Sequence, residues 1–99
     1  MFLKKGVSIK NLVPQMVFAV MVVNDWCKEN DVECVVTSGD EGRHMAGSLH
    51  YEGKALDFRT RDLPAHSKPA MFAEVQERLG SDFDVVLEKT HLHIEWQPA

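Results

Sequence analysis

Two short stretches of the chain carry side chains of the kinds that bind metals. The first holds His50 and Asp57, seven positions apart with Gly53 between them. The second holds His91 and His93, which would point to the same side of a strand. Two imidazoles and a carboxylate leave one tetrahedral position of Zn²⁺ open, as in catalytic zinc sites. The blander interpretation is that the five histidines are solvated, but the combination of residue types around a glycine favours a metal site.

The residues around these ligands form two extended patterns. Ser48, His50, Gly53, Ala55 and Asp57 fit S-x-H-x-x-G-x-A-x-D, and His91-Leu-His93 fits H-x-H. Together the patterns resemble the D-alanyl-D-alanine carboxypeptidase-like zinc peptidases, a family that also takes in the Hedgehog signalling domain and bacteriophage peptidoglycan endopeptidases. The resemblance covers residues 38–96. It implies that His50, Asp57 and His93 bind one Zn²⁺ per chain.

The resemblance also implies catalytic roles for residues near the ligands. Glu88, five positions before His93, would act as general base and acid on the zinc water. His91 would orient the substrate or stabilise charge, or it would replace His93 as the third ligand. The bland alternative for Glu88 is an exposed carboxylate paired with Lys89.

Two further residues would contact the substrate. Arg43 lies in a glycine-containing loop, and its forked donors suit a scissile carbonyl or a substrate carboxylate. Its bland alternative is a solvated loop cation. Ser48, together with Arg43, is assigned to substrate binding.

Two classes of function follow from the resemblance. The first is a zinc metallopeptidase, a hydrolase that acts as carboxypeptidase or endopeptidase on the stem peptide of peptidoglycan, as a cell-wall-degrading bacteriophage endolysin does. The second is a non-catalytic zinc-stabilised binding or structural module, such as a phage virion component. Glu88 and Arg43 favour the enzyme, because a structural zinc site would be closed by a fourth protein ligand.

Composition limits the other classes of function. The 99 residues, 44% of them hydrophobic, are enough for a single domain over residues 1–99 with one small core. The net charge of −4 argues against a nucleic-acid partner. Cys27 and Cys34 fit buried free thiols of a reducing compartment, and a single disulfide is the alternative. We expect a monomer or a weak homodimer whose partner is a peptidoglycan peptide.

The N-terminal region imitates a secretory signal, because Lys4 and Lys5 precede the apolar run Leu12–Val23. Pro14 and Gln15 interrupt that run, no cleavage site of small residues follows it, and it is shorter than the ~20 residues that a membrane span needs. We therefore expect no membrane span and cytoplasmic synthesis without a signal peptide, followed by action on the cell wall if the protein is a phage lysin.

Hydrophobic periodicity predicts an α+β fold. The expected helices are a central one that begins near Asn11, with Asn11 as its N-cap, and a second from Pro69 to Leu79, closed by Gly80. Phe72, Val75 and Leu79 form the buried stripe expected of the second helix. The expected strands cover Val32–Thr37, Lys54–Thr60, Phe83–Glu88 and His91–Trp96, and the irregular lead-in before the first helix includes a short extended piece at Met1–Lys4. Alternation along Lys54–Thr60 places Asp57 on the face opposite Leu56 and Phe58. The resemblance implies a small antiparallel-type sheet with the two helices packed on one side, as in Hedgehog and D-Ala-D-Ala peptidase folds.

Overall fold

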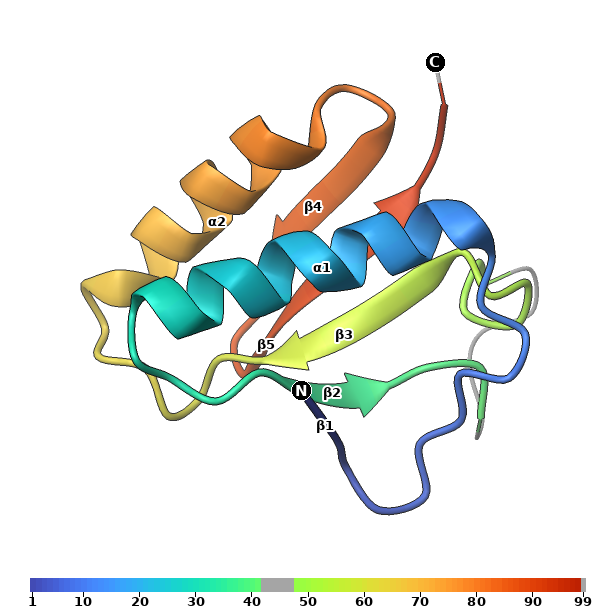
Figure 1. Ribbon diagram of the computed structural model, residues 1–99, viewed down its shortest axis with the longest axis horizontal. Helices are drawn as coiled ribbons and strands as arrows, with labels where there is room; N and C mark the ends of the chain where they lie inside the picture. Colours follow the sequence, from blue (N-terminus) through green and yellow to red (C-terminus); the bar gives the residue numbers. More distant parts are fainter. Residues whose placement is uncertain (42–47, 99) are drawn as a thin grey trace.

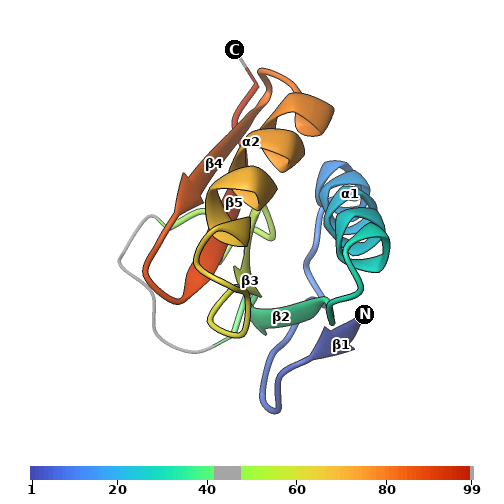
Figure 2. The ribbon, with the colours of Figure 1, turned by 90° about the vertical axis from the view of Figure 1, so that its left-hand side faces the viewer.

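A computed structural model describes residues 1–41 and 48–98. Its elements are β1 (Phe2–Leu3), α1 (Pro14–Glu29), β2 (Val35–Ser38), β3 (Ala55–Arg59), α2 (Ser67–Leu79), β4 (Phe83–Leu87) and β5 (His91–Trp96). The strands form one sheet in the order β1-β2-β3-β5-β4. Both helices lie on the same face of that sheet, α1 across its middle and α2 over β4 (Figures 1 and 2).

The α+β class and the two helices on one side are confirmed, but the sheet is mixed and not purely antiparallel. β1 pairs in parallel with β2, whereas the other three pairings are antiparallel. The reason is the connection, since α1 carries the chain from β1 to β2, and a helical crossover joins parallel strands.

Helix α1 begins at Pro14, three residues later than the sequence suggested. Val13 precedes the proline and is extended, with φ −75° and ψ 153°, because a residue before proline is disfavoured in the helical region. Asn11 therefore does not cap the helix, and its backbone N–H donates to Asp40 instead. The helix buries Met16, Ala19, Val22, Val23, Trp26 and Cys27. Helical spacing also predicted Leu12 and Val20 in this buried stripe, but both are only partly buried.

The outer face of α1 leaves apolar side chains uncovered. Val17, Phe18 and Met21 are 48%, 46% and 59% exposed. On the inner side, Cys27 and Cys34 are both buried free thiols. In the part of the chain that the structure describes, neither helix is long and apolar enough to cross a membrane.

Helix α2 buries Met71, Val75 and Leu79, while Phe72, expected in that stripe, packs against the core only partly buried. Gly80 ends the helix with φ +86°, a conformation that glycine adopts without steric cost.

Alternation along β3 and β5 separates the core from a polar face. Leu56 and Phe58 of β3 and Leu92 and Ile94 of β5 are at most 1% exposed and belong to the core beneath the helices. Their neighbours in sequence point to the opposite face. The residues predicted to bind a metal therefore lie on the side of the sheet that the helices leave uncovered.

Candidate metal centre

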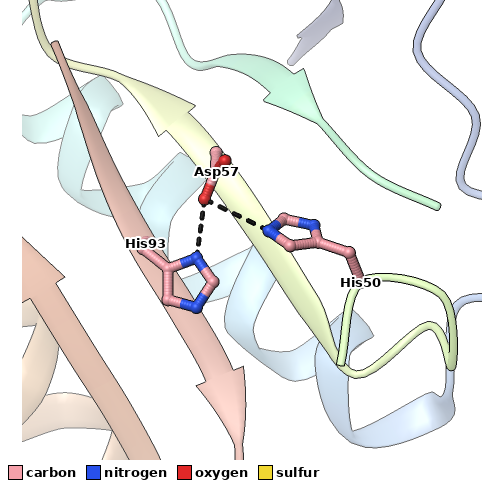
Figure 3. A group of neighbouring side chains, drawn as sticks. All are labelled: His50, Asp57 and His93. Carbon is pink, nitrogen blue, oxygen red and sulfur yellow. Dashed lines mark hydrogen bonds and ion pairs between the residues drawn. The ribbon is translucent and has the colours of Figure 1, made fainter. Parts of the chain in front are cut away.

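The pairing of β3 with β5 brings two of the predicted ligands together. In this antiparallel pair Asp57 lies directly opposite His93, and Arg59 lies opposite His91. Directly opposed residues point to the same face. As a result, Nδ1 of His93 lies 2.7 Å from Oδ1 of Asp57 (Figure 3).

His50 reaches the same carboxylate from the turn that precedes β3. Its Nε2 lies 3.5 Å from Oδ1 of Asp57, and the residue is only 5% exposed. One donor atom each of His50, Asp57 and His93 lie within 4.8 Å of one another. Figure 3 shows both rings directed toward the carboxylate.

Local backbone geometry explains why the turn before β3 has this sequence. The hydroxyl of Ser48 accepts the backbone N–H of His50 at 3.2 Å, so Ser48 fixes the turn that carries the ligand. Gly53 has φ +70°, and a Cβ there would lie 1.9 Å from the carbonyl oxygen of Asn11. The glycine of the pattern is therefore required by a close approach of two backbone segments.

A second glycine positions the His50 ring. Nδ1 of His50 lies 3.0 Å from the carbonyl oxygen of Gly39. A carbonyl can only accept, so Nδ1 donates to Gly39 and Nε2 is the ring nitrogen that faces Asp57. A Cβ on Gly39 would lie 2.1 Å from the carbonyl oxygen of Ser8, so this approach also needs glycine.

Glu95 is a site residue that the sequence reasoning missed. Its Oε1 lies 2.7 Å from Nε2 of His93, on the far side of the ring from Asp57, and Gln97 donates to its other oxygen. The signal was present in the sequence, since Glu95 follows His93 by two positions and so shares its face of β5.

The two carboxylates determine the charge of the His93 ring. The hydrogen bond with Asp57 raises the pKa of His93, burial opposes it, and Glu95 raises it further, giving a pKa of about 9 against an ordinary 6.5. Burial alone would raise the pKa of Asp57, but the hydrogen bonds with His50 and His93 hold it below its ordinary 3.8. Without a metal, His93 is therefore an imidazolium between two carboxylates.

The donor set fits a zinc ion. Nε2 of His50, Oδ1 of Asp57 and Nδ1 of His93 are nitrogen and oxygen ligands of the kinds that Zn²⁺ takes. The far nitrogen of each ring has its own acceptor, the Gly39 carbonyl and the Glu95 carboxylate. Metal-bound histidines almost always have such a partner, which fixes the tautomer and the ring orientation.

The other predicted residues lie at or beyond the edge of this cluster. Nε2 of His91 is 3.8 Å from Oδ2 of Asp57, and its Nδ1 lies 3.3 Å from the hydroxyl of Thr90. Glu88 is exposed in the turn between β4 and β5, and within the described ranges its carboxylate makes no hydrogen bond or ion pair. Arg43 lies outside the described residues.

Comparison with known proteins decides the family. The sequence pattern of the Hedgehog amino-terminal signalling domain matches residues 8–95. The chain belongs to this family. It is 36% identical over 77 residues to the Sonic hedgehog protein of Xenopus laevis, the Tiggy-winkle hedgehog protein of Danio rerio and the Indian hedgehog protein of Gallus gallus. The match covers 76% of this chain but only 16% to 18% of those proteins, so the chain spans less than a fifth of their length.

Membership of the Hedgehog family confirms one half of the resemblance and gives no support to the other. The fold agrees with a Hedgehog domain, while the matches found do not support the assignment to D-Ala-D-Ala peptidases and phage endopeptidases. The prediction of a zinc metallopeptidase that hydrolyses peptidoglycan is wrong, because the relatives are signalling proteins. The catalytic roles given to Glu88, His91 and Arg43, and the substrate contacts given to Ser48 and Arg43, depended on that enzyme and are not carried forward.

The predictions about partner, location and origin are wrong as well. A peptidoglycan peptide as partner, action on a cell wall and a bacteriophage origin were inferred from the peptidase half of the resemblance. Cytoplasmic synthesis was inferred from the interrupted apolar run near the N-terminus, and it is wrong too, because the matching relatives are hedgehog signalling proteins. The physical reason for the error is that the shared pattern specifies how the backbone holds three ligands. It does not specify what occupies the open side of the site.

Proposed function

We propose that this chain is a zinc-stabilised, non-catalytic protein-recognition domain of the Hedgehog signalling type, which acts outside the cell on a receptor protein. The family match over residues 8–95 carries the proposal. Of the two classes of function that the sequence suggested, the proposal keeps the non-catalytic binding module. It does not keep the phage virion component that served as an example of that class.

In this proposal His50, Asp57 and His93 bind one Zn²⁺, with Glu95 and Gly39 as outer partners. Support comes from the convergence of the three donor atoms and from the acceptors that the far nitrogen of each ring meets, the Gly39 carbonyl and the Glu95 carboxylate. The ion would supply a fixed cross-link among β3, β5 and the turn that carries His50. Binding to the folded chain only would stabilise it by mass action.

The recognition surface in this proposal is the face of the sheet that the helices leave uncovered. The metal cluster lies there, and so does Arg59, which together with Asp57 is half-buried. Such a face is polar and rigid, because its side chains project from paired strands. A rigid scaffold limits the ordering cost of binding.

Two measurements test the proposal. Zinc content of the purified chain should be one per molecule and should fall to near zero in Asp57→Asn. Surface plasmon resonance against the extracellular domains of the receptors of hedgehog proteins should show saturable binding that weakens after chelation. If the zinc-loaded protein shows no saturable binding to these receptors, the recognition role is refuted. If Asp57→Asn still holds one zinc per molecule, the proposed ligand set is refuted.

A further inference from the structure

A cavity of about 310 Å³ lies directly beside the metal cluster, and three cations line it. The cations are Lys4, Arg59 and Arg61, and one wall is Asp57. The chain as a whole carries a net charge of −4 with only eleven Lys and Arg residues. Three of those eleven converge on one cavity, which makes this part of the surface opposite in charge to the molecule as a whole.

Sheet topology explains how residues far apart in sequence reach this cavity. The backbone N–H of Lys4 donates to the carbonyl of Val36 at 2.9 Å, which extends the parallel β1–β2 pairing and fixes the lysine at the sheet edge. Arg59 belongs to β3, on the same face as Asp57, and Arg61 follows shortly after. Lys4 lies outside the residues 8–95 that match the family, so the family pattern alone does not account for the full set.

The charge balance of the cavity selects the ligand. Asp62 lies 3.9 Å from both Arg59 and Arg61, long distances that leave most of each guanidinium fork free. Within the described ranges the ammonium of Lys4 forms no ion pair. Among the described residues, three positive charges against the two carboxylates of Asp57 and Asp62 leave a balance of about one positive charge. That balance fits a monoanion better than a dianion.

Neutral hydrogen-bonding groups complete the lining. The hydroxyl-bearing side chains of Thr37 and Thr90 border the same space, from β2 and from the turn before β5. A carboxylate offers two acceptor oxygens for such donors and for a guanidinium fork.

We propose that this cavity binds a carboxylate, that of an acidic side chain on the partner protein, through Lys4, Arg59 and Arg61. The proposal rests on the protein-recognition role proposed above and adds the chemistry of one contact. The bound carboxylate contacts the cations beside Asp57 and does not require the metal. A partner that docks on this face places an aspartate or glutamate in the cavity.

The test is a nitrogen-15 NMR titration of the full chain with N-acetyl-Gly-Asp-Gly-amide, observing the backbone amides of Thr37, Arg59 and Arg61. The matched peptide N-acetyl-Gly-Asn-Gly-amide and inorganic phosphate serve as comparison probes. We expect saturable shifts with the aspartyl peptide, none with the asparaginyl peptide, and weaker binding of phosphate. The aspartyl shifts should persist in chelator.

Variants show which side chains hold the peptide. Arg61→Gln and Lys4→Gln, both at exposed positions, should each weaken the aspartyl peptide about tenfold, the typical effect of one hydrogen bond to a charged group. Lys68→Gln removes the same charge from α2 on the helix-bearing side and should change affinity less than about twofold.

Several results would overturn the proposal. The proposal is wrong if the asparaginyl peptide gives shifts as large as the aspartyl peptide, or if phosphate binds more tightly than the aspartyl peptide. It is also wrong if chelator abolishes binding of the aspartyl peptide, or if Lys68→Gln weakens that binding as much as Arg61→Gln does. Failure of the recognition role is distinguishable, since the aspartyl peptide would then bind while no receptor does.

Discussion

Proton and zinc compete for the same nitrogen of His93, so the stability of the metal-free protein should depend on pH in a range where that of the zinc-bound protein does not. In the metal-free chain the pKa of His93 is about 9, against 6.5 for the unperturbed group. A group whose pKa is raised by folding stabilises the fold fully below its unfolded value. That stability is lost as pH rises through the folded value, here between pH 6.5 and 9.

The difference between these pKa values corresponds to at most about 3 kcal/mol of unfolding free energy. The His93 side chain is 19% exposed, so solvent screening removes only part of this. Since about 1 kcal/mol shifts the unfolding temperature of a domain this size by about 4–8 °C, the chelated protein should lose about 10 °C or more between pH 6.5 and 9.

Zinc should cancel this trend between pH 6.5 and 9, because a ligand nitrogen must first lose its proton, and the unfolded chain has already lost it in that range. Zinc affinity should rise about tenfold per pH unit below pH 9, and the extra stability conferred by the metal should grow with it. The assay is thermal unfolding at several pH values, in chelator and at fixed free zinc. His93→Gln should abolish both the pH dependence of the unfolding temperature in chelator and the pH dependence of the stabilisation by zinc. His66→Gln, at an exposed turn, should keep both. A chelated wild type whose unfolding temperature stays flat or rises from pH 6.5 to 9 would refute the reasoning.

Three further substitutions test single contacts of the site. Glu95→Gln should weaken zinc about tenfold or more because the far nitrogen of the ring loses its charged acceptor, whereas the same change at exposed Glu88 should leave the zinc dissociation constant unchanged in a competition titration. His91→Gln should keep one zinc per chain by metal analysis, since its ring is 3.8 Å from Asp57; loss of the metal would make His91 the third ligand. Gly53→Ala should lower the free energy of unfolding, measured with denaturant, by more than about 2 kcal/mol. The reason is that φ is +70° and the added carbon would lie 1.9 Å from a carbonyl oxygen. A decrease below about 0.5 kcal/mol would contradict that geometry.

Much of the fold followed from the sequence because alternation and helical periodicity are local signals. The bounds of β5, His91–Trp96, were predicted to the residue, and the face that carries Asp57 was predicted correctly. The parallel pairing of β1 was not predictable, since two apolar residues without periodicity do not indicate their partner. The start of α1 was misplaced because asparagine was given more weight as a cap than proline as a constraint on the residue before it.

The site shows the same division between local and non-local information. His50, Asp57 and His93 were found from their types and spacing, and the structure brings them together. Gly39 was not assigned to the site because it acts through its backbone carbonyl, which orients the ring of His50 eleven residues later. A backbone carbonyl leaves no side-chain pattern in the sequence. Glu95 was overlooked although it shares the face of His93, because it lies outside the pattern used to find the ligands.

The error about function has a more general cause. A zinc site with three protein ligands is open on one side whether that side admits a substrate, a water or a partner protein. His50, Asp57 and His93, their turn and the two glycines account for the convergence of the three donor atoms, and that geometry is compatible with each of these uses. What separates them is the surface around the open side, and here that surface includes Lys4, Arg59 and Arg61 in one cavity against Asp57. These cations come from β1, β3 and the segment after β3, so only the folded arrangement places them beside the metal centre.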